Sequence, residues 1–299
     1  MEINELLEEG WTSNYAQLSE VKLHYVKAGS GPLLILLHGF PENWYSWKYQ
    51  IGPFSRHYTV VAPDMRGYNL SDKPDGIEPY HVEKLVRDIS ELITVLGYEK
   101  AEIVGHDWGC AIAWGMALLH PEQTEKLVAI CIPHPAQFAR DYSASFFMKL
   151  VWWHFRFLQI PRFPEWYLSI FDYLFLKSLF YIYSGKVSRV KPFLRPFLDG
   201  LSRDKGKAFH CAINYYRSNM DLKLSNFAKI GENRVKCPTL LLFGRKDPIW
   251  TASQAKRAPE TAEYIDAPFE FEEYKHIGHW TMMEDPETIN ARILKFLGK

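Results

Sequence analysis

The fold follows from residues 101–120, which read AEIVGHDWGCAIAWGMALLH. Residues 101–104 are predicted to form a short buried strand, and residues 110–120 a helix. Between them, residues 105–109 (GHDWG) have the small-x-nucleophile-x-small form of a nucleophile elbow, a tight turn whose flanking glycines prevent clashes. Asp107 is therefore the candidate nucleophile, although an aspartate in this place can also simply cap the following helix.

Short apolar segments of the same kind recur along the chain. Residues 33–37 (LLILL) form an unbroken apolar run, as expected of a strand buried on both faces. Residues 82–96 carry an apolar stripe at helical spacing and are followed by Gly97, a common helix stop. Further strands are expected near residues 15–27 and at 58–62, 127–132, 239–243 and 270–274. Strands that alternate with helices predict an α/β fold with a mostly parallel central sheet flanked by helices.

The alternation stops between residues 133 and 236, which are rich in aromatic residues, prolines and helical patterning. We expect a core domain made of residues 1–132 and 237–299, with residues 133–236 inserted as a helical cap domain. Ligands bind at the carboxyl ends of parallel strands, so an insertion that follows such a strand is expected to cover the site as a lid.

The composition is that of an ordinary folded protein. Of the 299 residues, 47% are hydrophobic and 23% are charged, and the 35 basic and 35 acidic side chains cancel. This balance disfavours binding to nucleic acid or to an anionic membrane. The first residues resemble no secretory signal, and no run of about 18 apolar residues could span a bilayer, so we expect a cytoplasmic protein.

Cysteine and histidine spacing gives no sign of a metal or organic cofactor. The four cysteines lie far apart without a C-x-x-C pair, which favours buried free thiols over disulfides or zinc. The scattered histidines have no metal-ligand spacing either. We therefore expect a protein that works without a cofactor.

Two further residues follow predicted strands in the order expected of an α/β-hydrolase triad. Asp247 comes just after residues 239–243, and His279 comes after residues 270–274. Taken singly, each could be a turn acid or a packed histidine, but the order nucleophile, acid, base makes the set coherent. Residues 38–41 (HGFP) follow the strand at 33–37, and the backbone N–H groups of Phe40 and Trp108 are expected to converge as an oxyanion hole.

These motifs resemble those of the α/β-hydrolase-fold epoxide hydrolases. The resemblance is carried by residues 38–41 (HGFP), 64–74 (DMRGYNLSDKP) and 105–109, and it continues through Asp247 and His279 over nearly the whole chain. It implies the α/β-hydrolase fold with a helical cap, and conversion of epoxides to vicinal diols. It also implies a cis bond before Pro41, and Asn69 stands where the family often has glycine, in a turn that asparagine tolerates.

The chemistry explains why an aspartate stands at the elbow. A carboxylate with a reference pKa of about 3.9 is ionised at neutral pH and can attack a saturated carbon directly, forming an ester. A serine would form an ether, which water does not readily cleave. His279, expected to be neutral near pH 7 and oriented by Asp247, would then deprotonate the water that hydrolyses the ester.

Opening the ring also needs a donor for the departing oxygen. Residues 212–219 (AINYYRSN) resemble the N-x-Y-R lid segment of the family, which assigns this role to Tyr216. Residues 152–161 (WWHFRFLQIP) resemble its first lid segment, with His154 where a second tyrosine is usual, as in some bacterial members. Tyr173 is the alternative second donor, and aromatic packing without catalysis is the plainer interpretation of both segments.

Two other functions are compatible with parts of this sequence. A haloalkane or haloacid dehalogenase would use the same aspartate, but Trp108 and Ala111 stand where haloacid dehalogenases have arginines, and Phe40 where haloalkane dehalogenases have Asn or Gln. A non-catalytic protein that binds a hydrophobic ligand would suit the aromatic lid equally. The aromatic residues predict an apolar pocket for aryl or alkyl epoxides, lined by Trp44, Trp47, Trp108, Trp152, Phe155 and Tyr173.

Overall fold

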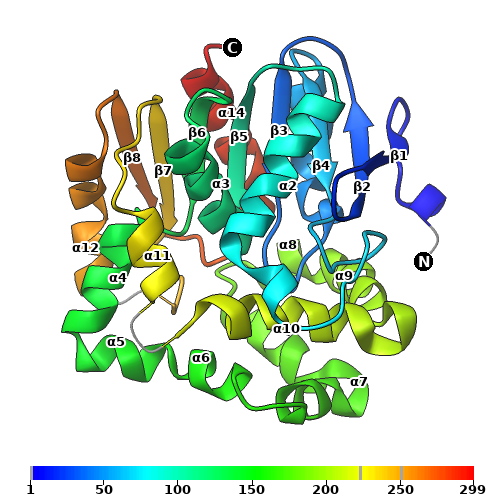
Figure 1. Cartoon of the computed structure of the whole chain (residues 1–299), viewed down its shortest axis with the longest axis vertical. Helices are drawn as coiled ribbons and strands as arrows, with labels where there is room; N and C mark the ends of the chain where they lie inside the picture. Colours follow the sequence, from blue (N-terminus) through cyan, green and yellow to red (C-terminus); the bar gives the residue numbers. More distant parts are fainter. Residues whose placement is uncertain (1–2, 222–223, 250–251) are drawn as a thin grey trace.

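The computed structural model describes residues 3–221, 224–249 and 252–299, which form an eight-stranded sheet with helices on both faces and at one end (Figure 1). The strand order is β1-β2-β4-β3-β5-β6-β7-β8. The strands are β1 (Thr12–Gln17), β2 (Lys22–Ala28), β3 (Leu33–Leu37), β4 (Thr59–Pro63), β5 (Ala101–His106), β6 (Thr124–Ile130), β7 (Thr239–Gly244) and β8 (Phe269–Tyr274).

The sheet is parallel except at one edge, where β1 pairs antiparallel with β2 and β2 with β4. From β4 through β3, β5, β6 and β7 to β8, every neighbouring pair is parallel. This topology is that of the α/β-hydrolase fold, and it confirms the sequence-based prediction of a mostly parallel sheet. All the carboxyl ends of these six strands therefore meet at one edge of the sheet.

Strand β3 shows why the sheet is buried on both faces. Leu33, Ile35 and Leu37 pack into one hydrophobic cluster, together with residues of α2 (Val82–Val95) and α3 (Trp108–Leu119). The intervening Leu34 and Leu36 pack into a second cluster, with residues of α1 (Lys48–Ser55) and α14 (Pro286–Leu297). The side chains alternate between the two faces, so an unbroken apolar run is required.

The helices from α4 to α11 lie between β6 and β7 in the sequence and gather at one end of the sheet (Figure 1). They fall within the segment 133–236, which we call the insertion. They are α4 (Pro135–Ala144), α5 (Phe146–Val151), α6 (Trp153–Leu158), α7 (Phe163–Ile182), α8 (Val187–Val190), α9 (Leu194–Leu201), α10 (Lys207–Asn219) and α11 (Ser225–Ile230). The limits of the two domains stay a prediction.

The remaining α-helices are α12 (Ala252–Arg257), which follows β7, and α13 (Thr281–Glu284), which follows β8. None of the helices in the described ranges is long and apolar enough to cross a membrane. All four cysteines are buried free thiols, as their spacing predicts.

Candidate active site

The turn between β5 and α3 places Asp107 in an unusual backbone conformation, with φ 51° and ψ −121°. A Cβ atom on Gly105 would lie 2.3 Å from the carbonyl oxygen of Gly109, and one on Gly109 would lie 2.1 Å from that of Leu37. Both positions therefore require glycine, as expected of a nucleophile elbow. The Asp107 side chain makes no hydrogen bond that caps α3, so the helix-cap interpretation is wrong.

The two oxygens of the Asp107 carboxylate have different surroundings. The backbone N–H of Phe40 donates to Oδ1 at 2.8 Å, and the backbone of Trp108 donates to the same carboxylate. The other oxygen, Oδ2, lies 3.8 Å from Nε2 of His279, beyond hydrogen-bonding distance. The Phe40-Pro41 bond is cis, as the family resemblance implies.

His279 and Asp247 come together from the ends of neighbouring strands. Nδ1 of His279 lies 2.7 Å from Oδ2 of Asp247, and the backbone N–H of Ile249 donates to the other Asp247 oxygen. Asp247 follows β7 and His279 follows β8, so parallel pairing brings the two loops to the same edge of the sheet. The structure thus brings Asp107, Asp247 and His279 into one row.

Burial lowers the pKa of His279, but Asp247 and then Asp107 outweigh that effect and raise the pKa to about 9. The expectation that His279 is neutral near pH 7 is therefore wrong for the free protein, because two carboxylates face the imidazole. Burial raises the pKa of Asp107, and the nearby charge of His279 opposes that rise. The two groups form an ion pair across the site.

A second buried pair of a carboxylate and an imidazole, Glu42 and His106, adjoins the first. It was not predicted from the sequence. Nδ1 of His106 is 2.8 Å from Oε1 of Glu42, while Nε2 of His106 is 2.9 Å from the carbonyl oxygen of His279. The Gly39 N–H donates to the other Glu42 oxygen at 3.2 Å. Burial raises the pKa of Glu42, but the charge of His106 outweighs it, so the net shift is downward. The pair joins the loop after β3 to the loop that carries His279.

One cluster in the described residues has donor atoms close enough for a metal: His106, Cys131 and His279, all within 4.8 Å. The nitrogens of both histidines already face protein acceptors or Asp107. Burial raises the pKa of the Cys131 thiol well above its usual value, which disfavours the thiolate that a metal needs. The surroundings of these three side chains therefore favour hydrogen bonds and ion pairs within the protein over the binding of a metal ion.

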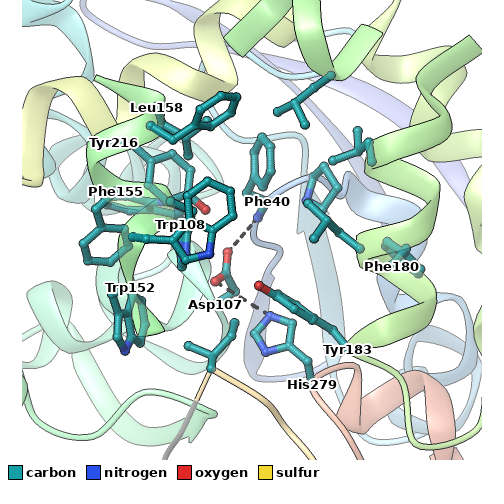
Figure 2. A pocket seen from close by; sticks show the side chains of 18 of the residues that line it. Phe40, Asp107, Trp108, Trp152, Phe155, Leu158, Phe180, Tyr183, Tyr216 and His279 are labelled. Carbon is teal, nitrogen blue, oxygen red and sulfur yellow. Dashed lines mark hydrogen bonds and ion pairs between the residues drawn. The ribbon is translucent and has the colours of Figure 1, made fainter. Parts of the chain in front are cut away.

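A cavity of about 310 Å³ opens above Asp107, between the sheet and the insertion. Figure 2 shows Asp107 and His279 at its base, with aromatic side chains around them. Of the predicted lining residues, Trp108, Trp152 and Phe155 do line it, and so do Phe40, His154 and Tyr216. The site is therefore a small cluster of polar side chains at the base of an apolar cavity.

Three predicted pocket residues lie elsewhere. Trp44 and Trp47 are fully buried in the hydrophobic cluster formed with α1 and α14, and Trp44 packs edge-on against Trp11. Tyr173 packs edge-on against Phe209 and does not line the cavity. Their assignment to the pocket is wrong because aromatic content alone does not distinguish a packed core from a cavity wall.

Tyr216 projects from α10 against Trp108, with ring centroids 5.2 Å apart at nearly a right angle. The Trp108 side chain is hydrogen-bonded to the Tyr216 hydroxyl. Since an indole N–H can only donate, the phenol oxygen accepts and its own proton stays available to a ligand. Burial raises the pKa of Tyr216 well above its usual value, and the charge of Asp107 adds to the rise. The hydroxyl is therefore a donor at neutral pH.

His154 lines the same cavity, with its ring centroid 6.4 Å from that of Tyr216. Its Nδ1 is buried without a hydrogen-bond partner. Burial, and to a lesser degree the charge of His279, lowers the pKa of His154 to about 4. The imidazole is therefore neutral near pH 7 and keeps one N–H that can donate.

Comparison with known proteins agrees with this arrangement. The family model of the alpha/beta hydrolase fold matches residues 32–160. Epoxide hydrolase 3 of Xenopus tropicalis is 37% identical over 292 residues, which cover 93% of this chain and 75% of that protein. Epoxide hydrolase 1 of Caenorhabditis elegans is 34% identical over 296 residues, which cover 97% of this chain and 71% of that protein. The chain belongs to the epoxide hydrolases of the α/β-hydrolase fold.

A solved structure of an epoxide hydrolase also has a similar fold. An epoxide hydrolase of Bacillus megaterium, solved with an inhibitor, matches with a TM-score of 0.84 at 27% identity. The match covers 96% of this chain and 100% of that one. The similarity therefore extends through the insertion as well as the sheet.

The cavity of this epoxide hydrolase is also lined by polar residues that were not predicted from the sequence, among them Tyr183. Tyr183, the residue at the C-terminal end of α7, lines the cavity, and its hydroxyl points toward Asp107 (Figure 2). No motif marks it, because it ends a long aromatic helix in which Tyr167, Tyr173 and Tyr181 look equivalent in the sequence. Only the fold shows that Tyr183, unlike Tyr173 and Tyr181, lines the cavity and lies beside His279.

Proposed function

We propose that the protein hydrolyses apolar epoxides to vicinal diols through a covalent ester on Asp107. The observation that carries the proposal is the asymmetric environment of the carboxylate. The backbone N–H of Phe40 holds Oδ1, whereas Oδ2 lies 3.8 Å from Nε2 of His279 at the base of the cavity that Asp107 lines. This arrangement suits a nucleophile whose held oxygen later becomes the carbonyl oxygen of an ester.

In the first half-reaction, Oδ2 attacks an epoxide carbon and the ring C–O bond breaks. The departing oxygen receives its proton from Tyr216, whose hydroxyl is oriented by Trp108. His154 supplies a second N–H to the same oxygen from the same cavity wall. Two donors lower the barrier to ring opening because both stabilise the negative charge that develops on the departing oxygen.

The ester then changes the electrostatics of the site. Alkylation removes the negative charge of Asp107, which is one of the groups that hold the pKa of His279 at about 9. The imidazole therefore loses its proton more easily in the intermediate than in the free enzyme. The same residue is an ion-pair partner before alkylation and a base after it.

In the second half-reaction, water attacks the carbonyl carbon of the ester and gives a proton to His279. The charge develops on Oδ1, to which the N–H of Phe40 already donates, and the backbone of Trp108 donates to the same carboxylate. The acyl C–O bond breaks and the diol oxygen takes the proton from His279. The second proton of the water, left on the new carboxyl oxygen, then passes to His279, which restores the Asp107 carboxylate and its ion pair. Tyr216 regains through solvent the proton that His279 released after alkylation.

The lining of the cavity supports an uncharged substrate. Among the lining residues of the described chain there is no arginine or lysine, and Trp108 and Ala111 both face the cavity. A haloacid would leave its carboxylate without a cationic partner there, which is unfavourable in an apolar site. The cavity therefore supports aryl or alkyl epoxides better than haloacids.

A substrate panel tests the proposal. Styrene oxide, an aliphatic epoxide, a haloalkane and fluoroacetate are each incubated with the protein and with Asp107→Ala. We expect diol from the epoxides with the unaltered protein alone. Halide release with inert epoxides would establish a dehalogenase instead, and tight binding without turnover would establish a ligand-binding protein.

Isotopic labelling tests the covalent step. During repeated turnovers in heavy-oxygen water, the attacking water leaves one labelled oxygen in the Asp107 carboxylate. Peptide mass spectrometry is expected to find the label at position 107. Diol formation with an unlabelled Asp107 would exclude the ester. The cytoplasmic location stays a prediction.

A further inference from the structure

Tyr183 places a phenol on the His279 side of the cavity, separate from the lid donors. Its ring centroid lies 6.1 Å from that of His279, at an interplanar angle of 75°. Figure 2 shows its hydroxyl above the imidazole and directed toward Asp107, while Tyr216 approaches Asp107 from the far side of Trp108. The hydroxyl thus borders the space where the second half-reaction needs its water.

The backbone holds Tyr183 to the loop of His279. The carbonyl oxygen of Tyr183 accepts the backbone N–H of His279 at 2.8 Å. The buried carboxylate of Glu284 bridges the two segments, because its Oε2 accepts the N–H of Gly185 at 2.9 Å and that of Gly278 at 3.0 Å. Three hydrogen bonds therefore fix the end of α7 relative to the base.

The glycines show that this close approach is built into the sequence. A Cβ on Gly278 would lie 2.4 Å from the carbonyl oxygen of Tyr183. A Cβ on Gly185 would lie 2.8 Å from Oε2 of Glu284. Larger residues at either position would push the two segments apart. Tyr183 is therefore positioned by the loop of the base, whereas Tyr216 is positioned by α10.

We propose that the Tyr183 hydroxyl orients the hydrolytic water for attack on the Asp107 ester. The inference rests on the proposed function and deepens it. One hydrogen of the water points to Nε2 of His279 and is transferred there, and the other is donated to the Tyr183 oxygen and stays on the water oxygen. A lone pair of the water oxygen then faces the carbonyl carbon of the ester. The new C–O bond forms at this carbon, and the alkyl–oxygen group leaves from it.

The phenol does not compete with His279 as a base. Burial raises the pKa of Tyr183, and the charges of Asp247 and Asp107 raise it further. The hydroxyl stays protonated at neutral pH, so it contributes a hydrogen bond and not a proton transfer. An oriented water that has lost part of its freedom reacts faster than one that samples several directions.

The test is Tyr183→Phe, which keeps the ring against His279 and removes only the oxygen. We expect the rate of alkylation to stay within twofold and the rate of ester hydrolysis to fall by about tenfold, the loss of one oriented hydrogen bond. The ester then accumulates in the steady state, visible as a protein mass increased by one substrate molecule. Rapid-quench kinetics with a fluorescent or chromogenic epoxide measures the two rates separately.

Tyr173→Phe is the matched control, because its hydroxyl lies outside the cavity and both rates should stay unchanged. Thermal unfolding of both variants shows whether the fold is kept. Unchanged hydrolysis in a folded Tyr183→Phe, or slower alkylation with normal hydrolysis, would overturn the inference. Absence of any ester in the unaltered protein and in every variant would instead reject the proposed function itself.

Discussion

His279 carries a charge in the free protein that it must lose before it can act as a base. Asp247 alone is not responsible, since Asp107 also contributes to the raised pKa. Only one of these carboxylates is neutralised when the ester forms. The change in the pKa of His279 between the free enzyme and the intermediate is therefore a measure of how strongly Asp107 acts on it.

We expect ester hydrolysis to accelerate with rising pH, with a midpoint below the value of about 9 that applies to His279 in the free protein. The direction follows because a base is active only after it has lost its proton, and alkylation favours that loss. Single-turnover rates between pH 6 and roughly pH 10 give the midpoint, and NMR titration of the free enzyme gives its counterpart. Equal midpoints would show that Asp107 has no influence.

Tyr216 is the proton donor on which alkylation depends. Tyr216→Phe is expected to slow alkylation by roughly a hundredfold, because a positioned acid typically contributes that much or more. Ester hydrolysis should change far less, since the departing oxygen is already protonated at that stage. Rapid-quench traces in which hydrolysis is slowed more than alkylation would remove Tyr216 from this role.

Single site residues could be predicted from the sequence where the backbone geometry allows only one residue type. Asp107 could be predicted because an elbow needs two glycines at fixed spacing, and the structure shows both glycines against backbone atoms. Glu42 and Tyr183 could not, because their partners are distant in sequence and no local pattern marks them. The charge of His279 could not be predicted either, since it depends on the distances to two carboxylates.

Among the elements, the elbow between β5 and α3 is the least tolerant of change. The helix α3 approaches β3 so closely that a Cβ on Gly109 would lie within 2.6 Å of three backbone atoms of Leu37 and His38. Backbone atoms cannot move aside like the end of a side chain. The element as a whole must shift if that glycine is replaced.

Gly109→Ala is therefore expected to lower the free energy of unfolding by about 1–3 kcal/mol, the usual cost of overpacking, and to reduce turnover through displacement of Asp107. Gly52→Ala in α1 is the matched control, since nothing lies within 4 Å of a Cβ there. That change should stabilise the protein by about 0.5–1 kcal/mol, because alanine favours a helix. Denaturant unfolding measures both, and equal effects would contradict the packing argument.

The strands were easier to predict than the lid. Residues 33–37 alternate between two clusters in the structure, so each residue of the run has a reason to be apolar. In the insertion, some aromatic side chains line the cavity and others pack against the core. Trp152 and Phe155 line the cavity, whereas Tyr173 packs on Phe209 beside the core, and the sequence alone has no period that separates them.

In the whole molecule, the position of Tyr216 depends on how α10 is fastened to the core. The hydroxyl of Tyr215 donates to the carbonyl oxygen of Arg66 at 2.7 Å. The buried side chain of Asn219 accepts the N–H of Val82 at 2.9 Å and donates to the carbonyl oxygen of Tyr80 at 2.8 Å. Asn219 thus also caps the first turn of α2 and joins the insertion to the sheet domain.

Asn219→Ala is expected to lower the free energy of unfolding by about 2–4 kcal/mol, because it leaves the Val82 N–H and the Tyr80 carbonyl buried without this partner. The freed end of α10 should also misplace Tyr216, so alkylation should slow more than ester hydrolysis. Asn14→Ala is the control, since the Asn14 amide donates to Thr12 within β1, far along the sheet from the insertion. A destabilised Asn219→Ala variant with a normal alkylation rate would show that Tyr216 stays in position without the hydrogen bonds of Asn219. The contact with Trp108 would then be assigned the role of positioning Tyr216.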